Sequence, residues 1–194
     1  MADRRLVIAT GNAGKLGEYQ DLLANTGVQL VPFDSQIEES GQTYRDNARL
    51  KAEAARDSTG LPSLGDDAGV EVDVLGGFPG VVSARIGPTQ KERTQALLDR
   101  LKAHPEPWFG RFVCTIAIAA PGHETEFFEG SCSGEIVPEW RGNAGFGYDP
   151  IFLVPEVGRT FGEMTPEEKH RYSHRAAAVR EMLAAGALDR LWAD

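Results

Sequence analysis

The start of the chain predicts a buried strand that runs through a glycine-containing loop directly into a helix. Leu6–Ala9 is a short apolar run with β-branched residues, which is typical of a buried strand. Thr10–Lys15 follows as the loop, and apolar residues then recur at helical spacing until Gly27, which is a C-terminal stop signal. A strand that feeds a helix is a building unit of α/β proteins, so this segment is the strongest constraint on the fold class.

The order of the remaining segments predicts a mixed sheet with helices. Further strands are predicted at 28–33, 70–75 and 151–154, helices at 43–60 and 89–101, and a hairpin of 111–120 and 125–131. Thr165 and Ser173 mark the starts of two more helices. We therefore expect an α/β or α+β fold in which residues 1–194 form one domain, with a smaller lobe at about residues 76–140.

The charge balance argues against a protein whose main task is to bind nucleic acid. The chain has 20 Lys and Arg against 29 Asp and Glu, a formal net charge of −9. A general nucleic-acid binder would instead carry a basic face. A small anionic ligand remains compatible with this balance, because a few local cations are enough to hold one.

Hydropathy and cysteine content predict a soluble cytoplasmic protein. The sequence has no stretch of 18 or more apolar residues, so we expect no membrane-spanning helix and no membrane partner. Two cysteines are too few for a disulfide framework. Cys114 lies inside the apolar run 112–120, which is typical of a core thiol.

The loop Thr10–Lys15 has the physical properties of a phosphate-binding site. Gly11 and Gly14 let backbone N–H groups approach a ligand, the next helix N-terminus is partly positive, and Lys15 adds a full charge. The loop is not a Walker A motif, because its glycines are too close together and no Ser or Thr follows Lys15. An ordinary turn between a strand and a helix would look the same, so both interpretations stand.

A second candidate is the carboxylate pair Asp66-Asp67, placed between glycines at the predicted end of a strand. Adjacent residues of a strand point to opposite faces, so the two side chains should differ in role. A carboxylate that faces a cleft can bind Mg²⁺ through oxygen or orient a water molecule, whereas an Asp-rich turn needs neither. The acidic segment 37–41 would supply a further oxygen ligand, unless it is only a solvated loop.

Two later motifs offer aromatic and basic side chains. Phe146 and Tyr148 lie between glycines and can stack on a base, although a tight turn with one core aromatic shows the same pattern. Ser173 is a plausible helix N-cap, so His174 and Arg175 follow at the positive end of a helix. Cations at that end indicate an anionic or carbonyl-bearing partner. Ser173 and His174 are adjacent and cannot form a nucleophile–base pair, which excludes a serine hydrolase.

The order of these motifs resembles the inosine triphosphate pyrophosphatase family, enzymes that remove non-standard purine nucleotides. The resemblance extends from about Leu6 to Leu191. The matching segments are Thr10-Gly11-Asn12 with Lys15, Asp66–Gly69, Leu75–Gly80 with Ser83-Ala84-Arg85, Phe146–Pro150 and Ser173-His174-Arg175. Several independent motifs in one order argue against a chance match.

This resemblance implies an elongated α/β fold with two lobes, a long central mixed sheet flanked by helices, and an active-site cleft between the lobes. It implies a homodimer that hydrolyses inosine, xanthosine and deoxyinosine triphosphates to the monophosphate and pyrophosphate. The implied cofactor is Mg²⁺, so the activity would be that of a Mg-dependent nucleoside triphosphate diphosphatase.

The resemblance also implies roles for the acidic residues and for the loop at the triphosphate. Asp67 is the expected general base and, with Glu38, a metal ligand. Asp66 is the alternative candidate for these roles, because the resemblance leaves the assignment within the pair open. The loop expected at the triphosphate consists of Thr10, Gly11, Asn12, Ala13, Gly14 and Lys15.

The residues expected at the base and sugar follow from the same resemblance. Lys169 should contact phosphate or base, and His174 and Arg175 should contact the purine. The segment expected at the base and sugar consists of Phe146, Gly147, Tyr148 and Asp149. Many members have a serine where this chain has Ala68, so a side-chain hydroxyl contact is lost there although a backbone contact can remain.

Two other functions fit parts of the pattern. A non-catalytic nucleotide-binding module would share the loop and the aromatic turn, but it would not need Asp66, Asp67 and Glu38 together. A related pyrophosphatase for other modified nucleotides, pyrimidines included, would keep every motif and differ only in the base that it accepts. A panel of nucleoside triphosphates separates these alternatives.

Overall fold

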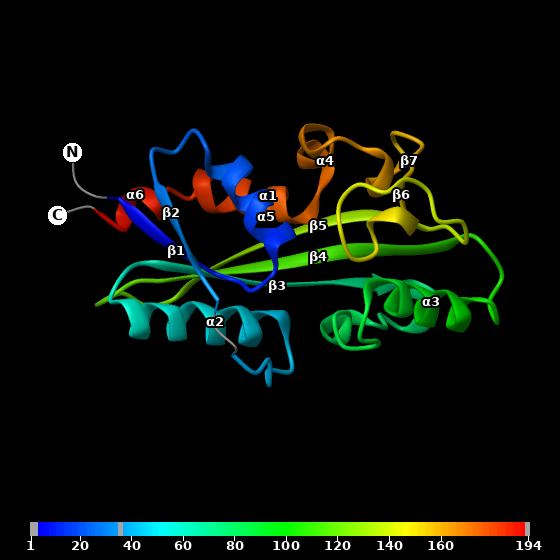
Figure 1. The fold of residues 1–194 in the computed structure, drawn as a ribbon, viewed down its shortest axis with the longest axis horizontal. Helices are drawn as coiled ribbons and strands as arrows, with labels where there is room; N and C mark the ends of the chain where they lie inside the picture. Colours follow the sequence, from blue (N-terminus) through cyan, green and yellow to red (C-terminus); the bar gives the residue numbers. More distant parts are fainter. Residues whose placement is uncertain (1–3, 35–36, 193–194) are drawn as a thin grey trace. The chain divides into compact units, whose positions relative to one another are not determined.

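The computed structural model describes residues 4–34 and 37–192, and its centre is a seven-stranded mixed sheet (Figure 1). The strands are β1 (Arg5–Ala9), β2 (Gln29–Phe33), β3 (Ser63–Val72), β4 (Trp108–Ala119), β5 (Glu126–Ile136), β6 (Phe152–Val154) and β7 (Arg159–Thr160). Their order in the sheet is β2-β1-β3-β4-β5-β6-β7. β1 is parallel to β2 and β3, whereas β6 is antiparallel to β5 and β7. The mixed sheet is as predicted.

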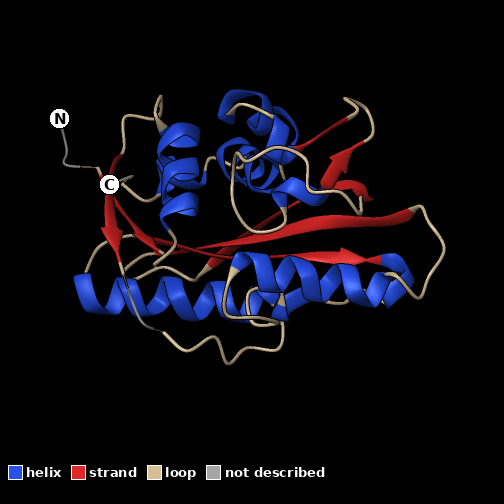
Figure 2. Cartoon of the chain, turned by 45° about the vertical axis from the view of Figure 1, so that its right-hand side comes forward, coloured by secondary structure: helices blue, strands red, loops and turns tan. Residues whose placement is uncertain are grey.

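Helices flank this sheet, as expected for an α/β protein (Figure 2). They are α1 (Ala13–Leu23), α2 (Tyr44–Thr59), α3 (Gln90–Leu101), α4 (Pro166–Tyr172), α5 (His174–Ala184) and α6 (Ala187–Arg190). The predicted caps are confirmed at α2, where the Thr43 side chain accepts from the Asp46 N–H, and at α3, where Thr89 and Glu92 form a capping box. Within the described residues, no helix is long and apolar enough to span a membrane.

The chain divides into two compact units. The first contains the described parts of Met1–Asp67, Cys114–Gly130 and Arg175–Asp194, and the second contains Ala68–Val113 and Ser131–His174. The smaller lobe expected at residues 76–140 overlaps the second unit only in part. The second unit also includes residues 68–75 and 141–174, and it leaves out residues 114–130, which belong to the first.

In the first unit, small side chains bring α2 close to the sheet. Ala48 and Ala52 of α2 are fully buried and cluster with Ala117 and Ala119 of β4. A Cβ on Gly65 would lie 2.5 Å from the Ala48 carbonyl oxygen, so only glycine permits this approach. Gly65 therefore serves helix packing rather than a turn. The strand predicted at residues 70–75 has the wrong bounds, because β3 runs unbroken from Ser63 to Val72 and Asp73–Leu75 form a 3₁₀ helix.

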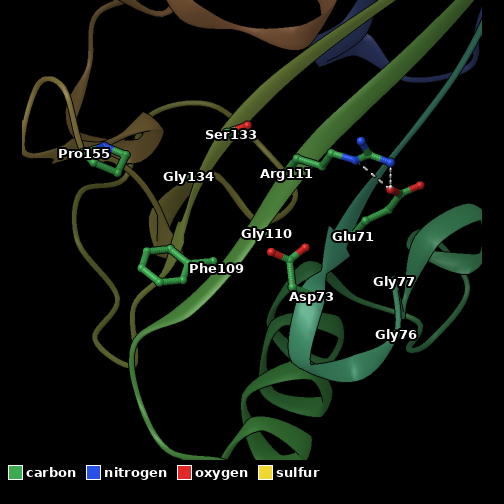
Figure 3. A pocket seen from close by; sticks show the side chains of 10 residues that line it. All are labelled: Glu71, Asp73, Gly76, Gly77, Phe109, Gly110, Arg111, Ser133, Gly134 and Pro155. Atoms are coloured by element: carbon green, nitrogen blue, oxygen red, sulfur yellow. Dashed lines mark hydrogen bonds and ion pairs between the residues drawn. The ribbon is translucent and has the colours of Figure 1, made fainter.

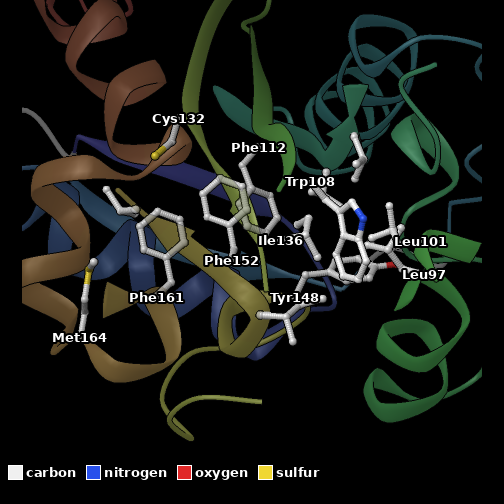
Figure 4. Packing of buried hydrophobic residues seen from close by; sticks show 14 residues of the cluster. Leu97, Leu101, Trp108, Phe112, Cys132, Ile136, Tyr148, Phe152, Phe161 and Met164 are labelled. Atoms are coloured by element: carbon white, nitrogen blue, oxygen red, sulfur yellow. The ribbon is translucent and has the colours of Figure 1, made fainter. Parts of the chain in front are cut away.

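The second unit has an aromatic core around β4 and β6 (Figure 4). The Phe112 and Phe152 rings lie 4.6 Å apart between centroids, and the Phe152 and Phe161 rings 5.3 Å apart. Tyr148, from the predicted aromatic turn, belongs to this buried cluster. The unit therefore has its own hydrophobic core.

Candidate active site

Asp66 and Asp67 lie in the middle of β3, not at its end, and they face different helices. Asp66 contacts side chains from α1 and α5, whereas Asp67 contacts side chains from α2. In Figure 1, α1 and α5 lie on one side of the sheet and α2 on the other. The expectation that neighbouring strand residues point to opposite faces is confirmed.

Asp66 is a buried carboxylate surrounded by cations. Its side chain is 1% exposed, its Oδ1 accepts from the Lys15 ammonium at 3.0 Å, and its Oδ2 accepts from Arg175 Nε and Nη2 at 3.2 and 3.0 Å. Burial by itself raises the pKa of Asp66, but the charges of Lys15, Arg175 and Lys51 outweigh burial and hold the pKa well below its usual range. Asp66 is therefore an ionised anchor and a poor proton acceptor.

Arg175 finds its anionic partners inside the protein. The side chain is 1% exposed, and besides Asp66 its Nη1 donates to the Glu18 carboxylate of α1. Burial alone would lower the pKa of Arg175, but Asp66 and Glu18 raise it well above its usual value. The sequence predicts an anionic or carbonyl-bearing partner for Arg175. In the structure the carboxylates of Asp66 and Glu18 are anionic partners of this kind.

Asp67 has a different electrostatic environment from its neighbour. Its Oδ2 accepts from Asn47 Nδ2 at 3.0 Å, and its Oδ1 lies 3.8 Å from the Lys51 ammonium. Burial raises the pKa of Asp67, and Lys51, Lys15 and Asn47 only partly reverse that effect, so the pKa stays above its usual value. A carboxylate with a raised pKa is a stronger base than an ordinary aspartate.

Sequence reasoning missed Asn47 and Lys51, which α2 presents one turn apart. The Lys51 ammonium donates to Glu39 at 2.7 Å. Burial lowers the pKa of Lys51, but the charges of Asp66, Asp67 and Glu39 raise it by a larger amount. The net pKa is therefore above its usual value. The buried face of α2 consists of Tyr44, Asn47, Ala48, Lys51, Ala52 and Ala55. Asn47 and Lys51 could have been identified from sequence as two polar residues four positions apart within a helical stripe of mostly alanine residues.

The acidic segment 37–41 joins the site through Glu39, while Glu38 is exposed. Ser35 and Gln36, which precede this segment, lie outside the described residues. No three His, Cys, Asp or Glu side chains gather as a metal cluster within residues 4–34 and 37–192. Mg²⁺ is usually held by one or two carboxylates together with substrate phosphates, so a magnesium site does not require such a cluster of protein side chains.

The loop before α1 is ordered by its own side chains. The Asn12 Oδ1 accepts from the Lys15 N–H at 3.1 Å and caps the helix, and the Asn12 N–H donates to Thr10 Oγ1 at 3.1 Å. Residues 11–13 are exposed. An exposed helix N-terminus beside the Lys15 ammonium is favourable for phosphate oxygens.

The second unit holds Phe146, Asp149 and Lys169 in one compact arrangement. The Asp149 Oδ2 accepts from the Phe146 N–H at 2.8 Å and from the Lys169 ammonium at 2.6 Å. The Lys169 ammonium lies 4.9 Å from the centroid of the Phe146 ring. Asp149 thereby closes the turn that carries Phe146 and fixes the lysine over the ring.

The other predicted residues of the second unit are more deeply placed. The Tyr148 side chain is 4% exposed and its hydroxyl donates to the Ser83 carbonyl at 2.7 Å. His174, also 4% exposed, stacks on Phe112 with 4.6 Å between ring centroids. Ala68 is half-buried, and Gly147 has a φ of 63° in its turn. Tyr148 and His174 are therefore fixed by packing.

A separate hollow of about 850 Å³ lies over β3, β4 and β5 in the second unit (Figure 3). Glu71 and Arg111 form an ion pair at its wall, with 2.8 Å between Arg111 Nη2 and Glu71 Oε2. Phe109, also in its lining, is 53% exposed. None of the ten lining residues is among the predicted site residues, so this hollow does not help to define the candidate site.

Similarity to known proteins covers most of the chain. A dITP/XTP pyrophosphatase of Gloeobacter violaceus is 51% identical over 183 residues, 93% of each chain. A dITP/XTP pyrophosphatase of Thermus thermophilus is 47% identical over 188 residues, 93% of this chain and 91% of the relative.

Solved structures show the same likeness in three dimensions. A HAM1 protein from Coxiella burnetii matches with a TM-score of 0.84 and 37% identity, over 94% of this chain and 98% of that one. The Ham1 protein of Staphylococcus aureus matches with a TM-score of 0.83 and 34% identity, over 96% and 99% of the two chains. Residues 6–185 match the Ham1 family profile. The resemblance predicted from motif order is confirmed, and the chain belongs to the Ham1 family.

Proposed function

We propose that the chain hydrolyses non-standard purine nucleoside triphosphates, with ITP, dITP and XTP as substrates, to the monophosphate and pyrophosphate. The observation that carries the proposal is the contrast between the two neighbouring carboxylates of β3. Asp66 is neutralised by Lys15 and Arg175, whereas Asp67 keeps a raised pKa beside Asn47. The relatives named dITP/XTP pyrophosphatase, at 51% and 47% identity, support the substrate class.

In the proposed reaction Asp67 accepts a proton from the water that attacks the α-phosphorus, the bond from this phosphorus to the oxygen that bridges it to the β-phosphate breaks, and pyrophosphate leaves. Lys15 and the N-terminus of α1 bind phosphate oxygens and offset their charge as it increases in the transition state. Asp66 holds the Lys15 ammonium in place through its 3.0 Å contact. We propose Mg²⁺ as the metal, held by Asp67 and Glu38 together with substrate phosphates, where it supplies the positive charge that phosphoryl transfer requires.

For recognition of the base we propose Phe146, Lys169 and His174 of the second unit. The Phe146 ring offers a face for stacking. Lys169 is a donor, and a purine with a carbonyl at position 6 presents an acceptor, whereas adenine presents an amino group there. We assign Arg175 an indirect role, because its guanidinium is already bound by Asp66 and Glu18.

Two further parts of the proposal concern assembly and location. We propose a homodimer, on the basis of the family resemblance. We also propose a cytoplasmic location, which the two buried free thiols of Cys114 and Cys132 support, since thiols stay reduced in that compartment.

The proposal predicts Mg²⁺-dependent release of pyrophosphate from ITP. A panel of ITP, dITP, XTP, ATP, GTP and modified pyrimidine triphosphates, assayed with and without Mg²⁺, measures the choice of base. Free phosphate is measured with and without a coupled inorganic pyrophosphatase, so that phosphate seen only with the coupling enzyme reports the release of pyrophosphate. Release of a nucleoside diphosphate and free phosphate as the first products would contradict the proposal. Preferred turnover of a modified pyrimidine triphosphate would instead identify a pyrophosphatase for other modified nucleotides. Tight nucleotide binding with no product would identify a binding module.

Removal of the Lys15 ammonium should weaken handling of the triphosphate. A hydrogen bond to a charged group contributes about 1.5–3 kcal/mol, so kcat/KM of Lys15→Ala should fall about tenfold to a hundredfold. Lys102→Ala is the matched control, because Lys102 is an exposed lysine whose ammonium pairs with Asp99 on the surface. Steady-state kinetics with ITP measures both variants. Equal kinetics for the two variants would show that the phosphate chain binds elsewhere.

A further inference from the structure

The acidic segment 37–41 is attached to α2 at two points. The Gly41 N–H donates to Asn47 Oδ1 at 2.8 Å, and the Lys51 ammonium donates to Glu39 at 2.7 Å. A Cβ on Gly41 would lie 2.6 Å from Asn47 Oδ1, so only glycine lets the segment come this close. The segment that carries Glu38 is therefore held against one particular face of α2.

Asn47 uses both ends of its carboxamide in this arrangement. Its oxygen accepts from the Gly41 N–H, and its Nδ2 donates to Asp67 Oδ2 at 3.0 Å. The reverse orientation of the amide would set its NH₂ group against an N–H and its oxygen against a carboxylate, so the contacts fix the assignment. The side chain is fully buried, at 0% exposure.

We propose that Asn47 is a positioning residue that holds the acidic segment 37–41 in register with Asp67. The proposal rests on the proposed function, in which Asp67 is the general base. One rigid, buried amide links the backbone of the segment to the carboxylate that accepts the proton. Loss of the two Asn47 hydrogen bonds leaves the acidic segment 37–41 and the Asp67 carboxylate in the protein, but the distance between them is no longer fixed.

Attachment of α2 to the sheet does not depend on this amide. The Ser63 hydroxyl of β3 donates to the Ala52 carbonyl of α2 at 2.6 Å, and Ala48 and Ala52 pack in the core of the first unit. Ser63 is also fully buried, and its hydroxyl donates to the backbone carbonyls of Ala52 and Ala119. Ser63→Ala therefore removes a buried hydrogen bond between α2 and β3 and spares the link to Asp67.

The test compares Asn47→Ala, Gly41→Ala and Ser63→Ala in the full chain. Gly41→Ala disturbs the same link from the other side, because the added Cβ would lie 2.6 Å from Asn47 Oδ1 and from Asp46 Cβ, so the test survives if Asn47→Ala does not fold. Amide hydrogen exchange of peptides from residues 37–43, read by mass spectrometry, measures the order of the segment without nucleotide. Steady-state kinetics with ITP and Mg²⁺ measures kcat and KM.

We expect faster exchange in this segment for Asn47→Ala and Gly41→Ala, but not for Ser63→Ala. We also expect kcat to fall about tenfold to a hundredfold in the first two variants with little change in KM, as small misplacements of reacting groups do. Unchanged exchange in both variants would overturn the proposal, and so would equal losses of kcat in all three variants. If wild type hydrolyses no nucleotide, the proposed function fails while the exchange comparison still tests the link.

Discussion

Replacement of Asp67 by asparagine should lower kcat by a factor of about 10² to 10⁴ or more, because it removes a positioned general base. The change keeps the shape of the side chain, and an asparagine oxygen can still accept from Asn47 Nδ2. It also removes one of the two charges proposed to hold Mg²⁺, which adds to the loss. Steady-state kinetics with ITP at saturating Mg²⁺ measures the effect.

Stability separates this catalytic loss from misfolding. The pKa of Asp67 is raised, so at neutral pH its ionised form costs folding free energy, and a neutral side chain avoids that cost. Tm of Asp67→Asn should therefore equal or exceed that of wild type. Asp57→Asn is the matched control, because Asp57 is an exposed residue of α2 in the same unit. If Asp67→Asn keeps more than about a tenth of the normal kcat, another carboxylate such as Glu38 must be the base.

The parts of the fold predicted from sequence are those with strong local signals. Thr43, Thr89 and Thr165 cap helices where the pattern places them, because a cap depends on a few adjacent residues. The continuity of β3 was not predictable in this way. Gly65 looks like a turn signal in sequence, but its lack of a side chain serves the close approach of α2, the helix that directly precedes β3, and no local pattern shows which residue this helix packs against.

The candidate site shows the same limit. The pair Asp66-Asp67 is identifiable from sequence, and so is its division between two faces of a strand. Which carboxylate is the anchor depends on Lys15 and Arg175, and the second of these is 109 residues away from Asp66 along the chain. Such long-range pairing has no periodic signal, so the sequence leaves the choice between the two carboxylates open.

Replacement of Asp66 by asparagine should destabilise the protein strongly. Removal of one partner from a buried ion pair costs about 3–5 kcal/mol, because the remaining charge stays buried without compensation. Here the guanidinium of Arg175 would keep its contact with Glu18 but lose the one with Asp66, and Lys15 would lose the carboxylate that it contacts. At about 2–4 °C per kcal/mol for a chain of this size, the expected fall in Tm is about 6–20 °C.

Urea denaturation of wild type and variants measures this free energy of unfolding. The best control is the neighbouring Asp67→Asn, which makes the same chemical change one residue away and should not lower stability. A double-mutant cycle of Asp66→Asn, Arg175→Met and the double variant measures the coupling between these two charges, because Arg175→Met by itself already takes the arginine away from Glu18. Equal stability of Asp66→Asn and wild type would show that the cations around Asp66 do not depend on it.

The pH dependence gives an independent check of the same prediction. A carboxyl group whose folded-state pKa is lowered stabilises the folded state at pH values above its unfolded pKa, which is about 3.9 for aspartate. That stabilisation is lost as the pH falls from this value toward the lower pKa of the folded state. The difference in unfolding free energy between wild type and Asp66→Asn should therefore be constant above about pH 5 and shrink below about pH 4. A difference that stays constant down to about pH 2 would mean that the loss comes from altered packing, because only the ionised form of Asp66 pairs with Lys15 and Arg175.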